Sequence, residues 1–170
     1  MTIRNAWGAV LAIAAAVVGL GTPGTAAASP AGSTCAVQTL NTGTYLTAVR
    51  GGGQVIDVIH SDATRIDAWE RFTFVDAGDQ HYGLRTANGN YVTAVRGGGQ
   101  VVDVVHTDGT TLRGWETFSL VPTGADRYAI RTFDGHYLTA IGGGGRVTDV
   151  LHTDATTIST WEQFRLVCGV

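Results

Sequence analysis

The chain repeats itself every 46 residues, and this feature constrains its fold more than any other. The segment Tyr45–His60 returns twice without a gap, as 91–106 and as 137–152. Aligned over 37 positions from Thr39 onward, the three copies are identical in 17 columns. The fold must therefore contain three similar units that bury their apolar faces against one another.

Each unit has the pattern of four short β-strands. Residues 45–49 and 55–60 are rich in β-branched side chains, and the glycines between them allow a tight hairpin. Residues 72–75 supply a further strand, and 82–86 lead into the next unit. Three units therefore predict twelve strands, and residues 29–170 show no helical periodicity.

Residues 1–28 have the composition of a secretory signal peptide. Arg4 is the only charged residue among the first 49, an apolar run follows at 7–20, and small residues follow at 25–29. The apolar run is shorter than the roughly 20 residues that a spanning helix needs, which argues against a membrane anchor. We therefore expect cleavage after Ala28 and a secreted, extracellular product.

Downstream of this site we expect a short linker over 29–34 and one domain over 35–170. Without Arg4, ten arginines and no lysine face fourteen acidic residues, so the net charge is −4. A mildly acidic chain without a basic cluster is a poor partner for nucleic acid or anionic membranes. We expect neither partner, and we expect a monomer.

Two cysteines, Cys35 and Cys168, lie near the two ends of the predicted domain. In an exported protein such a pair indicates a disulfide, which requires the ends of the domain to meet. A metal site is the weaker interpretation, because no further ligands accompany either cysteine at zinc-site spacing.

Two other repeat architectures fit this chain poorly. A propeller typically needs about four to eight blades, and an open stack of three units would hold its ends apart. Three four-stranded units that close on themselves form a β-trefoil, which is a six-stranded barrel capped by three hairpins with approximate threefold symmetry. Closure also removes exposed strand edges. The predicted fold is therefore an all-β β-trefoil of three 46-residue repeats.

The repeated motif also resembles a known family. Tyr-Leu-Thr-Ala, a glycine-rich turn, a Val-x-Asp segment and Trp-Glu-x-Phe-x-Leu-Val follow one another with small variations in each unit, and this order resembles the fascin-like β-trefoil domains. That family includes the actin-bundling fascins, the histidine-rich actin-binding hisactophilins and secreted bacterial domains found beside glycoside hydrolases. The resemblance covers Cys35 to Val170; it specifies the fold and leaves the ligand open. The Gln-x-Trp signature of ricin-type sugar-binding trefoils does not occur in the sequence.

Large aromatic residues recur at fixed positions in each unit. Their size and spacing suit the shared core of a threefold barrel. We expect core positions for Trp69, Trp115, Trp161, Phe72, Phe118 and Phe164. The alternative role of the tryptophans is to stack on sugar rings at the surface.

A glutamate follows each of these tryptophans, and Glu70, Glu116 and Glu162 are the only glutamates in the chain. If the tryptophan points inward, the glutamate points outward or into the seam between units. There it would accept hydrogen bonds from turn amides or pair with arginine. A catalytic carboxylate pair is the alternative, but three identical environments do not separate the pKa values of an acid and a base. We expect no catalytic residues and no enzymatic activity.

The motif Asp-Val-x-His-x-Asp occurs once per unit. Carboxylates, together with an imidazole that both donates and accepts hydrogen bonds, suit the hydroxyls of a sugar. In an extended chain His60 and Asp62 share a face and Asp57 lies on the other. The predicted ligand-binding residues are Asp57, His60, Asp62, Asp103, His106, Asp108, Asp149, His152 and Asp154.

A structural role for this motif is the alternative, with an Asx-turn at Asp62 and a histidine packed at the barrel end. A cation could be held only if a third ligand converges, so we predict no metal and no cofactor. The glycine triplets that follow Arg50, Arg96 and Gly142 are expected to be flexible hairpin tips, because no helix follows them to bind a phosphate.

Together these features predict a secreted carbohydrate-binding, lectin-like module with up to three equivalent shallow pockets around the threefold axis. Several weak sites on one rigid domain can act together on a polysaccharide or other glycan. The alternative is a protein-binding trefoil without a glycan ligand, which binds actin or inhibits a protease. The signal peptide argues against actin unless the target lies in another cell, and residues 121–125 are the only modest candidate for an inhibitory loop.

Overall fold

The computed structural model describes residues 29–170, and the predicted signal peptide over 1–28 lies outside this range. The described chain forms twelve β-strands and six short 3₁₀ turns, which confirms the prediction of an all-β chain. No helix in this part of the chain is long and apolar enough to cross a membrane.

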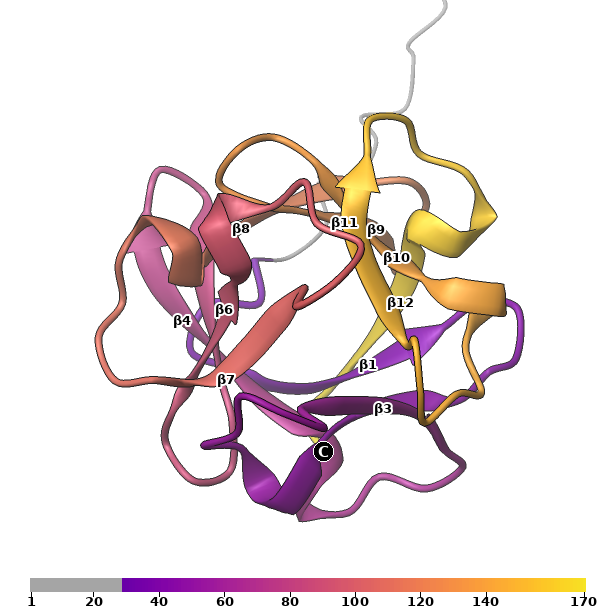
Figure 1. The fold of residues 1–170 in the computed structure, drawn as a ribbon, viewed down its shortest axis with the longest axis horizontal. Coiled ribbons are helices and arrows are strands. Elements are labelled where there is room, and N and C mark those ends of the chain that lie inside the picture. The colour runs from indigo at the N-terminus through magenta and orange to yellow at the C-terminus, as the bar shows by residue number, and fades with distance from the viewer. Residues whose placement is uncertain (1–28) are drawn as a thin grey trace, which may run out of the picture.

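Six strands close into a barrel in which every neighbouring pair is antiparallel (Figure 1). Strand β1 pairs with β12 and β4, β5 pairs with β4 and β8, and β9 pairs with β8 and β12. The barrel strands are β1 (Thr34–Thr39), β4 (Arg71–Gly78), β5 (His81–Arg85), β8 (Thr117–Pro122), β9 (Arg127–Arg131) and β12 (Gln163–Cys168). Because the ring is closed, the barrel presents no free strand edge.

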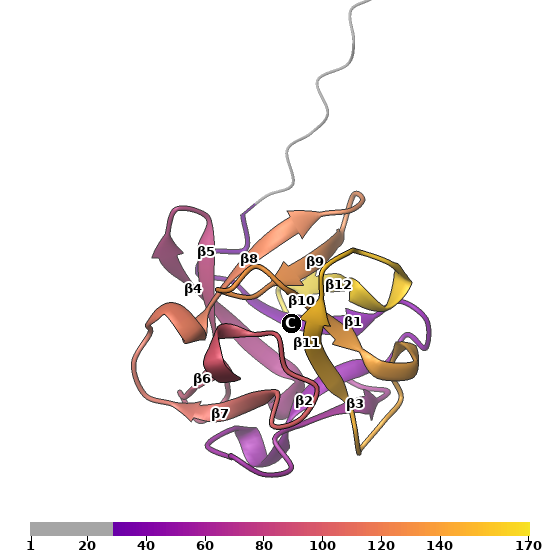
Figure 2. The same cartoon turned by 45° about the horizontal axis from the view of Figure 1, so that its top comes forward.

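The other six strands form three hairpins whose second strands, β3, β7 and β11, surround the centre of the view in Figure 1; Figure 2 shows them from another angle. The hairpins pair β2 (Tyr45–Ala48) with β3 (Ile59–Ala63), β6 (Tyr91–Ala94) with β7 (Val105–Gly109), and β10 (Tyr137–Ala140) with β11 (Leu151–Ala155). A six-stranded barrel with three hairpins is a β-trefoil, as predicted.

The three hairpins are hydrogen-bonded into a ring. The loop of each hairpin donates a backbone hydrogen bond to the second strand of another hairpin. These bonds run from Gly53 N to Thr107 O at 2.7 Å, from Gly99 N to Thr153 O at 2.7 Å and from Gly145 N to Ser61 O at 2.8 Å. Each unit therefore depends on a neighbour for part of its backbone pairing.

The core fills the barrel with side chains from equivalent positions in the three units. Phe72, Phe118 and Phe164 are fully buried, which confirms this part of the predicted core. Ile59 and Val105, with Leu151 of the third unit, belong to the same core cluster and come from the hairpin strands. Burial of this apolar surface is the main driving force for folding.

The two ends of the barrel meet as predicted. Cys35 in β1 is the register partner of Cys168 in β12, and a disulfide joins them.

The strand register also shows that the first unit has one additional residue before its hairpin. Tyr45 pairs with Gln38, whereas Tyr91 pairs with Arg85 over a connection that is one residue shorter. Gln38 is thus the structural counterpart of Arg85.

One predicted strand boundary is wrong. Residues 55–57 form a bend, and β3 begins only at Ile59. Asp57 has a φ of 52°, in the left-handed region, which aspartate tolerates better than most residues, and its counterparts in the other units do the same. The β-branched Val55, Ile56 and Val58 favour a strand, so the residue types do not indicate the bend.

The glycine triplets are not free hairpin tips, which corrects a second expectation. Gly51 and Gly52 are buried, and both adopt positive φ angles. Asn88 of the next unit donates its backbone N–H to Gly51 O at 2.9 Å. The triplet is therefore a contact between units, and side chains of the next unit occupy the space that a Cβ would fill.

Candidate functional site

Each Asp-Val-x-His segment closes its bend with a hydrogen bond between the aspartate and the histidine. His60 Nε2 lies 2.7 Å from Asp57 Oδ1, and the corresponding distances are 2.7 and 2.8 Å in the second and third units. An extended strand would place Asp57 and His60 on opposite faces. This expectation is wrong, because the left-handed Asp57 turns the chain and brings the carboxylate to the imidazole.

The third member of the motif, Asp62, lies apart from this pair. It is exposed on β3, on the same side of the strand as His60, as predicted from strand alternation. Among the described residues, the carboxylates of Asp62, Asp108 and Asp154 form no ion pair. No group of three or more His, Cys, Asp or Glu side chains within residues 29–170 is arranged to hold a metal ion.

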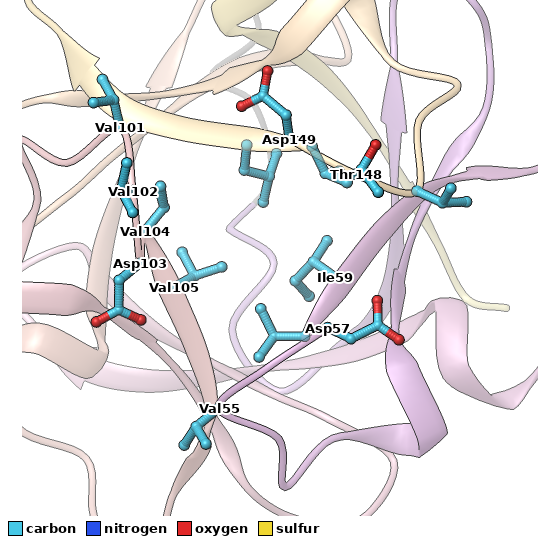
Figure 3. Close-up of a pocket in the computed structure, with 14 residues that line it drawn as sticks. Val55, Asp57, Ile59, Val101, Val102, Asp103, Val104, Val105, Thr148 and Asp149 are labelled. Atoms are coloured by element: carbon cyan, nitrogen blue, oxygen red, sulfur yellow. The ribbon is translucent and has the colours of Figure 1, made fainter.

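The three bends surround one shared depression of about 530 Å³ at the hairpin end of the barrel (Figure 3). Ile59 and Val105 lie near its centre, and Val55 and Val101, which begin two of the bends, lie farther out (Figure 3). Asp57, Asp103 and Asp149 belong to its lining, but their carboxylates point away from its centre (Figure 3). The sequence predicts three separate pockets, whereas the three bends line a single depression. Of the nine predicted binding residues, its lining includes only Asp57, Asp103 and Asp149.

This shared depression is chemically apolar. Val, Ile and Leu account for most of its lining, and Val102 within this lining is 77% exposed. A sugar placed at its centre would bury hydroxyls without hydrogen-bond partners, which is costly. The aspartate–histidine pairs could contact a ligand only from the rim.

The tryptophans are at the surface, which corrects the predicted core. Trp69, Trp115 and Trp161 remain 47%, 48% and 42% exposed. Each lies in a one-turn 3₁₀ segment that directly precedes a barrel strand, so the strand alternation assumed from the sequence does not apply there. Each of these turns contacts the glycine turn of its own unit.

The glutamates hold these turns in place. The Glu70 carboxylate accepts hydrogen bonds from Thr47 Oγ1 at 2.7 Å and from Asp67 N at 2.8 Å, and Glu116 and Glu162 make the corresponding contacts. Glu70 and Glu162 are buried. The predicted role of accepting bonds from turn amides is confirmed, but the faces are reversed: the glutamate points inward and the tryptophan outward.

Replacing Glu70 with alanine should lower the free energy of unfolding by about 1–3 kcal/mol, because the Thr47 hydroxyl and the Asp67 N–H lose their acceptor. Urea denaturation followed by circular dichroism measures this change. Glu116, which is less buried, is the matched control, and Glu116→Ala should cost less. Equal losses at the two positions would contradict burial as the cause.

The seams between units contain a further aromatic residue that sequence reasoning missed. Phe133, at the start of the third unit, is 59% exposed. Its ring packs against Gly114, the residue before Trp115 in the second unit. Phe133 has no aromatic counterpart in the other units, so the search for repeated residues passed over it.

The comparisons with known proteins bear on the fold. No protein-family model matches the sequence, and no curated protein matches it. Solved structures do match. A designed threefold-symmetric protein, ThreeFoil, aligns with a TM-score of 0.69 at 14% identity, over 79% of this chain and 97% of its own.

Two natural proteins align similarly. SeviL bound to asialo-GM1 saccharide has a TM-score of 0.61 at 14% identity, over 81% of this chain and 98% of its own. An exo-β-1,3-galactanase from Clostridium thermocellum has a TM-score of 0.66 at 13% identity, over 80% of this chain and 30% of its own. Identities this low establish the fold alone: residues 29–170 form a β-trefoil.

Proposed function

We propose that this chain is a secreted, non-enzymatic carbohydrate-binding module with up to three shallow sites, one at each seam between units, and that it belongs to the fascin-like group that its motif resembles. The observation that supports this most directly is the exposure of one indole ring in every unit. The saccharide bound to the structurally similar SeviL is consistent with the proposal.

An exposed indole suits a sugar because its flat apolar face can cover the C–H face of a pyranose ring while its N–H stays free to donate. The buried glutamate hydrogen bonds fix the turn that carries each indole. A contact surface that is rigid before binding loses less conformational entropy when the ligand arrives. Phe133 adds a second aromatic surface at the seam of Trp115.

The nine aspartates and histidines predicted from the sequence are a second candidate location for the ligand. The carboxylates of Asp57, Asp103 and Asp149, at the rim of the depression, are exposed and could accept hydrogen bonds from sugar hydroxyls. The apolar centre of the depression favours the tryptophan seams over this location. Variants at the tryptophans and at the aspartate–histidine pairs distinguish these two locations.

Calorimetric titration with an oligosaccharide selected on a glycan array tests the proposal. Trp115→Ala should reduce the number of bound ligands from three to two while leaving the unfolding transition almost unchanged, because the ring is half exposed. Residues 29–170 contain only these three tryptophans, so intrinsic fluorescence also reports the contact.

The matched control is His106→Ala, which changes the Asp103 pair and leaves the seams intact. Lost stoichiometry in the histidine variant, with normal binding by Trp115→Ala, would move the site to the rim. Absence of binding to any glycan would favour the alternative function.

That alternative is a protein-binding trefoil. The exposed Ile56 and Val102 favour it, because apolar side chains that gather at one end of a domain often mark a protein interface. Binding of a protein at this end would be lost in the double variant Ile56→Ser/Val102→Ser and retained by Trp115→Ala. Binding of a glycan at the seams would instead be retained by the double variant and reduced in Trp115→Ala.

A further inference from the structure

The seam between the first and second units contains a groove of about 320 Å³ on the outer surface of the barrel. Its lining comes from β1, the 3₁₀ turn before β4, the start of β4, and the end of β5 with the turn that follows it. The residues that carry the argument are Thr34, Arg71, Thr73 and Arg85, together with Ala68, which directly precedes Trp69.

The strand register places these four side chains side by side. Thr34 is opposite Thr73, and Thr73 is opposite Arg85, so three strands contribute one row. Arg71 and Thr73 are two residues apart on β4 and share its outward face. Diagonal neighbours in such a sheet have Cβ atoms roughly 7–8 Å apart, so the two guanidinium groups can reach one small ligand between them.

Neither arginine is neutralised by the protein. Within residues 29–170, Arg71 and Arg85 form no ion pair with any carboxylate. Two like charges beside each other repel, and a shared anion would relieve that repulsion. The groove is thus a local positive site in a chain whose net charge is negative.

The other two seams lack this arrangement. In the second, Arg131 stands in place of Arg85, but Thr117 replaces Arg71, and Arg131 Nε donates to Gly135 O at 3.0 Å. In the third, Arg165 replaces Thr73 and pairs with Asp126 at 2.8 Å. The threefold symmetry is therefore broken where the two unpaired arginines occur.

We propose that this groove binds the carboxylate or sulfate group of an acidic saccharide. A guanidinium presents parallel N–H donors that match the oxygens of such a group. The threonine hydroxyls, which lie 3.3 Å from each other, offer further donors. The inference rests on the proposed function: Trp69 directly follows the groove residue Ala68 in the chain, and we propose that its ring covers the same sugar.

Dextran and dextran sulfate are suitable probes because they share a backbone and differ in the sulfate groups, and polygalacturonate tests a carboxylate. The protein should bind both acidic polymers more tightly than dextran. The variant Arg71→Gln/Arg85→Gln should weaken that binding at least about tenfold, which corresponds to roughly 1.4 kcal/mol, and leave neutral glycans unaffected.

The matched control is Arg127→Gln/Arg165→Gln, which removes the same charge from the third seam, where Asp126 already compensates Arg165. It should change the affinity by less than about twofold, a loss of at most roughly 0.4 kcal/mol. An equal loss of affinity in both double variants would show that the polymers respond to the positive charge of the surface in general and not to this groove, and it would overturn the inference. Stronger binding to a single-stranded oligonucleotide, or equally tight binding of free inorganic sulfate, would also overturn it.

The two proposals fail separately. If neutral glycans bind at the tryptophans and the acidic polymers bind no more tightly, the groove assignment alone is wrong. If no saccharide binds, neutral or acidic, the proposed function is wrong and the groove assignment falls with it.

Discussion

Replacing Cys35 and Cys168 with alanine should lower the free energy of unfolding by roughly 5 kcal/mol. The disulfide joins residues 133 positions apart in the sequence. In the chain-entropy model, a cross-link over a loop of this size restricts the unfolded chain by about that amount. A domain of ordinary stability has only about 5–15 kcal/mol in total. The variant is therefore expected to be partly unfolded at physiological temperature.

Urea titrations of the two single variants and of the double variant measure this effect. Either single replacement breaks the bond, so each should cost nearly as much as both together. The slope of the free energy against urea should rise, because the unfolded chain without the cross-link exposes more surface. If the losses in the free energy of unfolding of the two single variants instead add up to that of the double variant, lost side-chain packing is the cause.

The fold could be predicted from the sequence because its two strongest signals are non-local. A 46-residue repeat defines three equivalent units, and a cysteine near each end of the domain requires those units to close. Neither signal depends on the boundary of any single strand. The bend at Asp57 shifted one boundary and left the architecture unchanged.

The orientation of Trp69 could not be predicted from its residue type, because burial of the indole competes with burial of the Glu70 carboxylate. Apolar size favours burial of an indole. The buried carboxylate of Glu70 nevertheless satisfies a hydroxyl and a backbone amide that would otherwise lack partners. Adjacent side chains in a 3₁₀ turn project in different directions, so when Glu70 points inward to satisfy the turn, the tryptophan is left outside. A glutamate at the same position in every unit was the available signal.

The candidate site could be predicted only in part because the seams combine residues from neighbouring units. Asp57 and His60 are three residues apart and form a local pair. The row that contains Thr34, Thr73 and Arg85 instead comes from three strands and two units. Its members become neighbours only through the barrel register, which the repeat pattern does not specify.

Replacing Gly52 with alanine should cost about 2–6 kcal/mol, the second large effect that we expect. Gly52 has a φ of 103° and a ψ of −175°, a conformation that is essentially restricted to glycine and costs other residues about 1–3 kcal/mol. The added methyl group would also overlap Thr86 Oγ1 of the next unit and lie 2.8 Å from Thr86 Cβ. Such overpacking typically adds about 1–3 kcal/mol.

Gly53→Ala is the matched control, because it separates these two causes. Gly53 also has a positive φ, of 80°, but a methyl group there would lie 3.6 Å from its nearest neighbour, Asn90 Oδ1. This variant should therefore lose only about 1–2 kcal/mol, the cost of the left-handed backbone. Thermal and urea unfolding of both variants give the comparison. Similar losses would mean that the seam can relax around Thr86, and that backbone conformation alone selects glycine in the triplet.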